Sequence, residues 1–412
     1  MKNNFYILYA IVVLWCVTFS HKIPGVPQEW PLLYHGVILI ALGLLYSFFR
    51  LFMRRNIVFY GGVLLFLYLV LLFLMSLDII VHPQGRNPFI LRIILLHVFP
   101  IVCILIQDDK SIDSLVTTFA RTISIFTLIN TLIAWYFFMG GSISLFGIEY
   151  KSSIYFISRI HGVMGEPTHF GLLQGLGIIS LLYLYRKEQT RGPLSRNTNI
   201  LYLILGLLFF VSILFSGTRN AFISTVTTLL VYSTLDRHAR KIINNYGLKI
   251  IVPILLIMSV MLYDQLYIWL SNIRYNSEYS NYERIFAVTS SIQIVSNFNI
   301  IEFLFGIGFT QSHYYVPTSF NQYIDILRNF GFLWSFIGLL LLALVIRRYM
   351  YLLKSGYFFA VYPLALLIYS LTVCMFYTPL DNLFNVVAFA FESCVLFTFL
   401  INRKMLAQSN LF

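Results

Sequence analysis

The stretch LYLILGLLFFVSILFSGTRNAFISTVTTLLVYSTL, residues 201–235, consists of two apolar runs separated by the five residues from Ser216 to Asn220. Each run approaches the roughly 20 residues that a helix needs to cross the hydrocarbon core of a bilayer. An arginine between two such runs is costly unless it reaches the membrane surface or has a function. The stretch therefore predicts two membrane-spanning helices joined by a short turn that carries Arg219.

The rest of the chain has the same character. Of its 412 residues 59% are hydrophobic and 11% are charged, whereas soluble proteins contain about 25% charged residues. We predict an all-α polytopic membrane protein that forms a single membrane domain over residues 1–412. Apolar runs predict about twelve spans, near 5–20, 31–49, 57–77, 88–107, 115–138, 168–185, 199–215, 220–235, 250–270, 322–346, 357–377 and 384–401.

The net charge of +12 comes from basic residues that lie mainly in the loops between the predicted spans. Basic residues cluster in alternate loops, as the positive-inside rule describes, so we expect both termini to be cytoplasmic and expect no nucleic-acid partner. Two long loops, about 139–167 and 271–321, then lie on the outer side, and 282–299 within the second loop could form an amphipathic helix. The four cysteines lie in apolar runs and indicate neither disulfides nor a zinc site.

The first outer loop ends in the polar, glycine-rich segment RIHGVMGEPTHFG, residues 159–171. Glu166 precedes Pro167, which suits the first position of a helix, so the carboxylate could simply favour the helix dipole. Alternatively, Glu166 or a flanking histidine, His161 or His169, could act as an acid or base.

Three arginines are expected on the outer side, namely Arg159, Arg219 and Arg284. A guanidinium is permanently charged and its planar fork matches phosphate oxygens, so the three together suit a lipid diphosphate. Each could instead extend to the lipid headgroups or pair with a nearby acid.

In the second outer loop, His313 precedes a patch of Asn321, Tyr323 and Asp325 at the start of a span. Aromatic rings beside hydrogen-bonding groups suit a sugar, although an interfacial aromatic belt has the same composition. The chain contains no phosphate-binding P-loop, and we expect no metal and no cofactor.

Four motifs resemble the bacterial O-antigen polymerases, called Wzy, and more distantly the O-antigen ligases. The motifs are Arg159 with Gly162, Glu166 and Pro167; Ser216 with Arg219; Arg284 followed by Gly306 and Gly308; and Asn321 with Tyr323 and Gly331.

This resemblance implies a metal-independent, inverting glycosyltransferase with a C-type membrane bundle, located in the bacterial inner membrane. It would transfer the growing glycan from undecaprenyl diphosphate onto the non-reducing end of a new lipid-linked repeat unit at the periplasmic face. Arg219 and Arg284 would hold the donor diphosphate, and Arg159 would add to the same field or bind the second lipid. Membrane lipids and a chain-length regulator protein are further expected partners.

The resemblance leaves the general base open among Glu166, His169 and His313, in that order. Ligases carry a histidine immediately before the asparagine of the fourth motif, where this chain has Phe320. An O-antigen ligase, or a capsule or exopolysaccharide polymerase, remains the alternative within the same class. A flippase for lipid-linked oligosaccharides is the alternative from another class, and it is less favoured because the chain shows no internal repeat.

Overall fold

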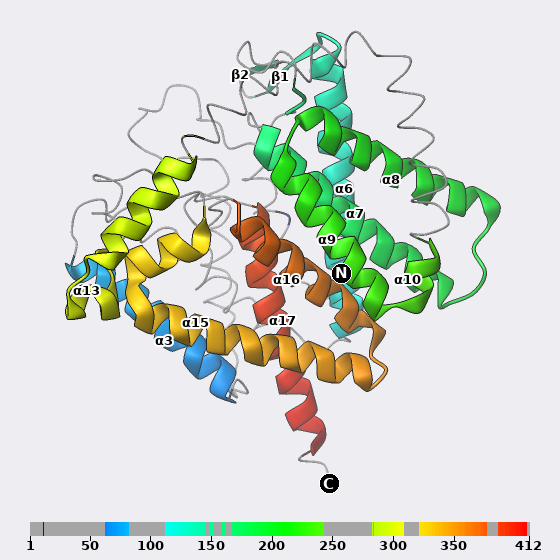
Figure 1. The fold of residues 1–412 in the computed structure, drawn as a ribbon. Helices are drawn as coiled ribbons and strands as arrows, with labels where there is room; N and C mark the ends of the chain where they lie inside the picture. The colour runs from blue at the N-terminus through cyan, green and yellow to red at the C-terminus, as the bar shows by residue number, and fades with distance from the viewer. Residues whose placement is uncertain are drawn as a thin grey trace. The chain divides into compact units, whose positions relative to one another are not determined.

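The structure is a computed structural model that describes residues 11, 62–81, 112–145, 148–151, 159–161, 167–242, 282, 284–308, 321–376 and 386–409 (Figure 1). Contacts divide the chain into two compact units. Unit 1 comprises Met1–Thr122, Phe146–Ile148 and Ala287–Phe412, and unit 2 comprises Ile123–Leu145 and Glu149–Phe286. We describe each unit by itself, and the single membrane domain remains a prediction.

The described elements are α3 (Gly62–Val81), α6 (Ile112–Phe138), β1 (Ser142–Leu145), β2 (Ile148–Lys151), α7 (Pro167–Gln189), α8 (Arg196–Ser216), α9 (Arg219–Leu235), α10 (Arg237–Ile242), a helix over 284–296, α13 (Ile300–Phe305), α15 (Gln322–Lys354), the 3-10 turn η6 (Phe358–Ala360), α16 (Val361–Cys374) and α17 (Val386–Ser409).

Four of these helices, α6, α7, α8 and α15, are long and apolar enough to cross a membrane. The prediction of a helical membrane protein is confirmed in this coarse form. The predicted spans 199–215 and 220–235 coincide closely with α8 and α9. Those near 31–49, 88–107 and 250–270 lie outside the described residues, as does 5–20 apart from Ile11. The count of twelve and the cytoplasmic termini therefore remain predictions.

The one sheet in the described ranges is a two-stranded hairpin of β1 and β2. It falls within the first predicted outer loop. Each strand has four residues, and so short an alternation of side chains cannot be told from a loop by its sequence pattern. The structure is mostly helical, as the all-α prediction requires, and this hairpin is a small addition to it.

In unit 2, α7 packs against both α8 and α9, and the three helices lie side by side in Figure 1. Where α7 crosses α6, a Cβ on Gly177 would lie 2.5 Å from Cγ2 of Thr127. Beside this crossing, the buried Thr131 hydroxyl donates to Oε1 of Gln174 at 2.9 Å. Small residues and interhelical hydrogen bonds of this kind let membrane helices approach closely.

The helices α7 and α9 run parallel and are tied together at both ends. At their N-terminal ends, the Thr218 hydroxyl donates to the carbonyl of Pro167 at 3.0 Å. At the opposite ends, Arg186 and Asp236 form an ion pair at 2.7 Å. Pro167 is the first residue of α7, as predicted, because a helix needs no N–H donor at that position.

In unit 1, α15 packs against α3, α16 and α17, and α16 packs against α17. The buried ring of Phe119 lies 5.6 Å from the ring of Phe389 and 5.4 Å from that of Phe397. These aromatic contacts join the first part of α6 to α17.

The helix α15 is broken at Gly331, where φ is 73° and ψ is −176°. This conformation is open almost only to glycine. At the break, the carbonyls of Arg328 and Asn329 accept hydrogen bonds from the backbone N–H groups of Ile307 and Gly308, both at 3.0 Å. The loop that follows α13 therefore supplies the donors that the broken helix lacks.

The same crossing requires a second glycine. Gly306 also has positive φ, and a Cβ there would lie 2.3 Å from the carbonyl oxygen of Asn329. A Cβ on Gly331 would lie 2.4 Å from the backbone nitrogen of Gly306. The glycines of the third and fourth sequence motifs therefore meet, and backbone packing explains why both positions are glycine.

Candidate functional site

The turn between α8 and α9 is the centre of the candidate site. Gly217 ends α8 in the left-handed conformation, with φ of 63°, and its N–H donates to the carbonyl of Leu214 at 2.9 Å. Residues with side chains rarely adopt this conformation, so glycine is favoured here. Thr218 then starts α9 in an extended conformation. The turn thus sets the C-terminus of α8 beside the N-terminus of α9.

Arg159 lies over this turn. Its Nε donates to the carbonyl of Ser216 at 2.7 Å, and the N–H of Ile160 donates to the carbonyl of Phe215 at 3.1 Å. A Cβ on Gly217 would lie 3.0 Å from Nε of Arg159. The guanidinium therefore satisfies a terminal carbonyl of α8, where the helix dipole favours positive charge. Arg159 has a structural role in addition to the binding role predicted for it.

Arg219 is the first residue of α9 and is exposed. The preceding Thr218 makes no side-chain capping bond, because its hydroxyl donates to Pro167 instead. The start of α9 thus combines a partial positive charge and outward N–H groups with a guanidinium. This combination attracts anions.

Arg284 lies within electrostatic range of Arg219, although the two residues are far apart in the sequence. Arg284 is partly buried, and this burial together with the neighbouring charge of Arg219 lowers the pKa of Arg284 below its ordinary value. Arginine remains protonated at neutral pH, so both side chains carry a full positive charge. Two like charges near one another repel, and an anion bound between them would offset this repulsion. The diphosphate-binding role of Arg219 and Arg284 remains a prediction.

The candidate acids and bases are only partly described. Glu166 and His313 lie outside the described residues. His169 is the third residue of α7 and is partly exposed, whereas His161 is buried. Because Pro167 is bonded to Thr218, the first turn of α7 with His169 lies at the same end of the bundle as Arg219.

Asn321 and Tyr323 each have a structural contact in unit 1. Asn321 caps α15, accepting from the N–H groups of Tyr323 and Ile324, and its Nδ2 donates to the carbonyl of Met375 at 3.3 Å. The Tyr323 hydroxyl donates to the carbonyl of Leu371 at 2.8 Å. These bonds tie the start of α15 to the end of α16. Sugar binding by Asn321 and Tyr323 remains a prediction.

Asp325 is fully buried and pairs with Arg328, an arginine that we did not single out from the sequence. Oδ1 of Asp325 lies 3.2 Å from Nη2 of Arg328. Arg328 also donates to the Ser291 hydroxyl at 2.8 Å and to Oδ1 of Asn329 at 3.2 Å. The spacing of three residues on a helix could have indicated this pair. The geometry gives Asp325 a structural partner close to the break in α15, and its predicted sugar-binding role is not tested.

Among the described residues, no group of three or more histidine, cysteine, aspartate or glutamate side chains could hold a metal ion. The metal-free and cofactor-free chemistry expected from the sequence remains a prediction.

In comparisons with known proteins, no family model matches the chain, and no curated protein matches it. The described helices and the arginines that they bring together are therefore the basis for the function proposed below.

Proposed function

We propose that this protein is a polysaccharide polymerase of the O-antigen type, acting on lipid-diphosphate-linked oligosaccharides at the outer face of a bacterial inner membrane. The observation that carries the proposal is that Arg219, the first residue of α9, lies near enough to Arg284 for its charge to lower the pKa of Arg284. Both belong to motifs that resemble those of the polymerases.

A diphosphate fits this arrangement for electrostatic reasons. It carries several negative charges that offset the repulsion between the two guanidinium groups, and each guanidinium can form two parallel hydrogen bonds to phosphate oxygens. The partial positive charge at the start of α9 adds to the same field. The apolar helix α8, which is long enough to span a membrane and is mostly exposed, suits the lipid part of such a donor.

The reaction is a single displacement at a sugar carbon. A hydroxyl of the acceptor repeat unit attacks the anomeric carbon of the donor glycan, and the bond from that carbon to the diphosphate oxygen breaks. The lipid diphosphate leaves with the bonding electrons, and the configuration of the anomeric carbon is inverted. Arg219 and Arg284 stabilise the negative charge that develops on the leaving oxygen, which is preorganised electrostatic catalysis.

The acceptor hydroxyl must lose its proton during this attack, so a general base assists the reaction. Glu166, His169 and His313 are the candidates. His169 lies at the end of α7 that is tied to the Arg219 turn, which makes it the candidate base whose surroundings the described residues support best.

Conservative substitutions test the proposal. Arg219→Lys and Arg284→Lys keep the positive charge but lose the paired hydrogen bonds, so each should lower the rate of polymerisation by about tenfold or more. Arg191→Lys, an exposed arginine in the loop between α7 and α8, is the matched control and should retain the wild-type rate. Polymer length and rate are measured with purified full-length protein and polyprenyl-diphosphate-linked oligosaccharide.

A wild-type polymer ladder from both lysine variants would remove the two arginines from the mechanism. A loss of activity that is restored by Mg²⁺ after treatment with a chelator would contradict the metal-independent reaction.

A further inference from the structure

The ends of α7 and α9 opposite to Arg219 carry a second concentration of positive charge. Residues 186–196 and 236–242 include seven basic and two acidic residues, which leaves a net charge of +5. These segments form the last turn of α7, the loop to α8, the first residue of α8, and α10. All of them belong to unit 2.

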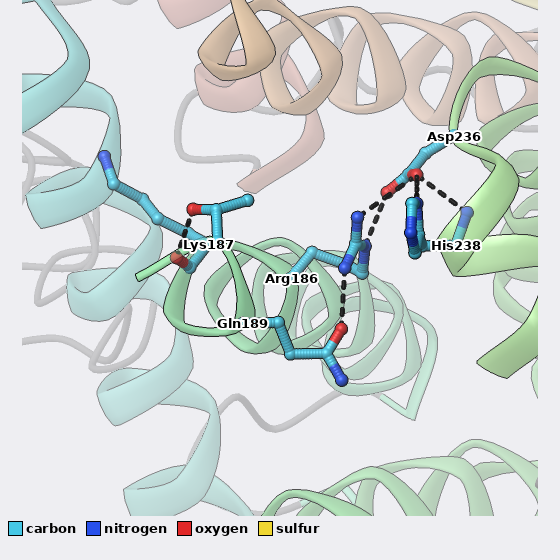
Figure 2. Close-up of polar contacts among 6 residues, drawn as sticks. Arg186, Lys187, Gln189, Asp236 and His238 are labelled. Carbon is cyan, nitrogen blue, oxygen red and sulfur yellow. Dashed lines mark hydrogen bonds and ion pairs between the residues drawn. The ribbon is translucent and has the colours of Figure 1, made fainter. Parts of the chain in front are cut away.

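One acidic residue of this region, Asp236, is paired with Arg186 in a buried ion pair. Nε of Arg186 donates to Oδ2 of Asp236 at 2.7 Å, and Nη2 donates to Oδ1 at 3.3 Å. Nη1 of Arg186 donates to Oε1 of Gln189 at 2.6 Å. Figure 2 shows this cluster, with Lys187 extending away from it on the other side of α7. Because the pair is buried, Asp236 does not offset the charge of the exposed basic residues.

Asp236 also fixes the direction of the chain. It ends α9 in an extended conformation, and its Oδ1 accepts from the backbone N–H of His238 at 2.9 Å, so it caps α10. The short helix α10 packs against α9 and α7, with Ala239 fully buried. The ion pair to Arg186 therefore holds α10 against the ends of the two membrane helices.

The basic side chains that remain are available to a partner. Arg191, Arg196 and Lys241 are exposed, and none of the three forms an ion pair in the part of the chain that the structure describes. We call these three residues the basic surface.

The distance along α7 from its first residue to the basic surface is close to the thickness of the hydrocarbon core of a bilayer. Arg186 follows Pro167 by nineteen residues, which is about 28 Å along a helix that rises 1.5 Å per residue. The hydrocarbon core of a bilayer is about 30 Å thick. If Arg219 lies at one edge of this core, the basic surface lies at the opposite edge, where phospholipid phosphates are found.

We propose that the basic surface binds anionic phospholipid headgroups in the leaflet opposite to the Arg219 end. Phosphate oxygens accept hydrogen bonds from the guanidinium and ammonium groups, and the fixed position of α10 keeps Lys241 beside the ends of α7 and α9. Exposed basic residues next to a membrane helix attract anionic lipid in this way. The inference is independent of the function proposed for the Arg219 end.

The test compares spin-labelled phosphatidylglycerol with spin-labelled phosphatidylcholine around full-length protein in phosphatidylcholine nanodiscs, measured by electron paramagnetic resonance. Wild-type protein should prefer phosphatidylglycerol. The variant Arg196→Gln/Lys241→Gln should lower this preference by about fivefold for each charge removed. The matched variant Arg347→Gln/Lys354→Gln, which removes two exposed charges at the end of α15, should retain most of it.

Several results would overturn the proposal. One is the absence of any preference in wild-type protein, and another is an equal loss of preference in the two double variants, since either would mean that the basic surface is not a particular site. Tight binding of soluble polyglutamate without a preference for phosphatidylglycerol would instead indicate an acidic protein partner. Competition by soluble glycerophosphoglycerol as strong as by the lipid would show that the site recognises free phosphate rather than a membrane.

Discussion

Replacing Arg219 by glutamine tests whether this arginine binds a ligand or stabilises the fold. Arg219 is exposed and stands close to the partly buried Arg284. The repulsion between them has the size of other surface charge pairs, so Arg219→Gln should change the stability of the unliganded protein by only about 0.5 kcal/mol. The loss of a structural arginine would instead destabilise the fold by more than this amount.

The same substitution should weaken anion binding. A hydrogen bond from a charged group contributes about 1.5–3 kcal/mol, so Arg219→Gln should lower the affinity for inorganic pyrophosphate by about ten- to a hundredfold. The assay is thermal unfolding of the purified full-length protein at low ionic strength, where charge interactions are least screened. Pyrophosphate should raise the unfolding temperature of wild-type protein and have little effect on the variant.

Arg347→Gln is the control, because it removes one exposed positive charge from α15, in unit 1 and outside both proposed binding sites. It should leave the pyrophosphate response unchanged. Two results would refute the reasoning: a loss of more than about 1 kcal/mol in the unliganded Arg219→Gln protein, which exceeds the range for surface charge pairs, or an undiminished response of that variant to pyrophosphate.

Further substitutions test the packing within each unit. Gly331→Ala or Gly306→Ala should cost about 3 kcal/mol or more, because both positions have glycine-only dihedrals and face backbone atoms within 2.6 Å. Gly206→Ala, with open space around it in α8, should leave the free energy of unfolding unchanged or raise it; equal losses would contradict the packing argument. Asp236→Asn should cost about 3–5 kcal/mol by leaving the charge of Arg186 buried without its partner, and chemical unfolding measures this loss.

The sequence was sufficient to predict most of the described helices. The runs at 168–185, 199–215 and 220–235 coincide with α7, α8 and α9 because polar residues at their ends limit the length that lipid can accommodate. The cap of α8 by Gly217 and the start of α7 at Pro167 are also local signals, since backbone conformation alone explains both residues.

Contacts between distant parts of the chain could not be predicted in this way. The ion pair of Arg186 and Asp236 joins residues fifty positions apart, and no local pattern links them. Gly331 was noted only as part of the fourth motif; the break of α15 at this residue depends on donors from the loop after α13 and could not be read from the sequence. Glu392, a buried carboxyl group in α17, shows that a span expected to be apolar can still contain an acid.

The residues of the candidate site were predicted partly from charge and expected sidedness and partly from the family resemblance. Charge and expected sidedness selected Arg159, Arg219 and Arg284, and the family resemblance assigned two of them to one diphosphate. The geometry adds the proximity of Arg219 to Arg284 and the bond from Arg159 to the end of α8. That bond was not predictable, because the backbone carbonyl that Arg159 meets becomes available only once α8 ends at Gly217.

The most direct measurement of the central claim is the conversion of lipid-diphosphate-linked repeat units by purified wild-type protein in liposomes that contain no other protein. A polymerase of the proposed kind should form a ladder of lipid-linked polymers in the presence of a chelator, with release of free lipid diphosphate for each unit added. Repeat units that cross the liposome membrane without becoming longer would contradict the account and identify a transporter instead.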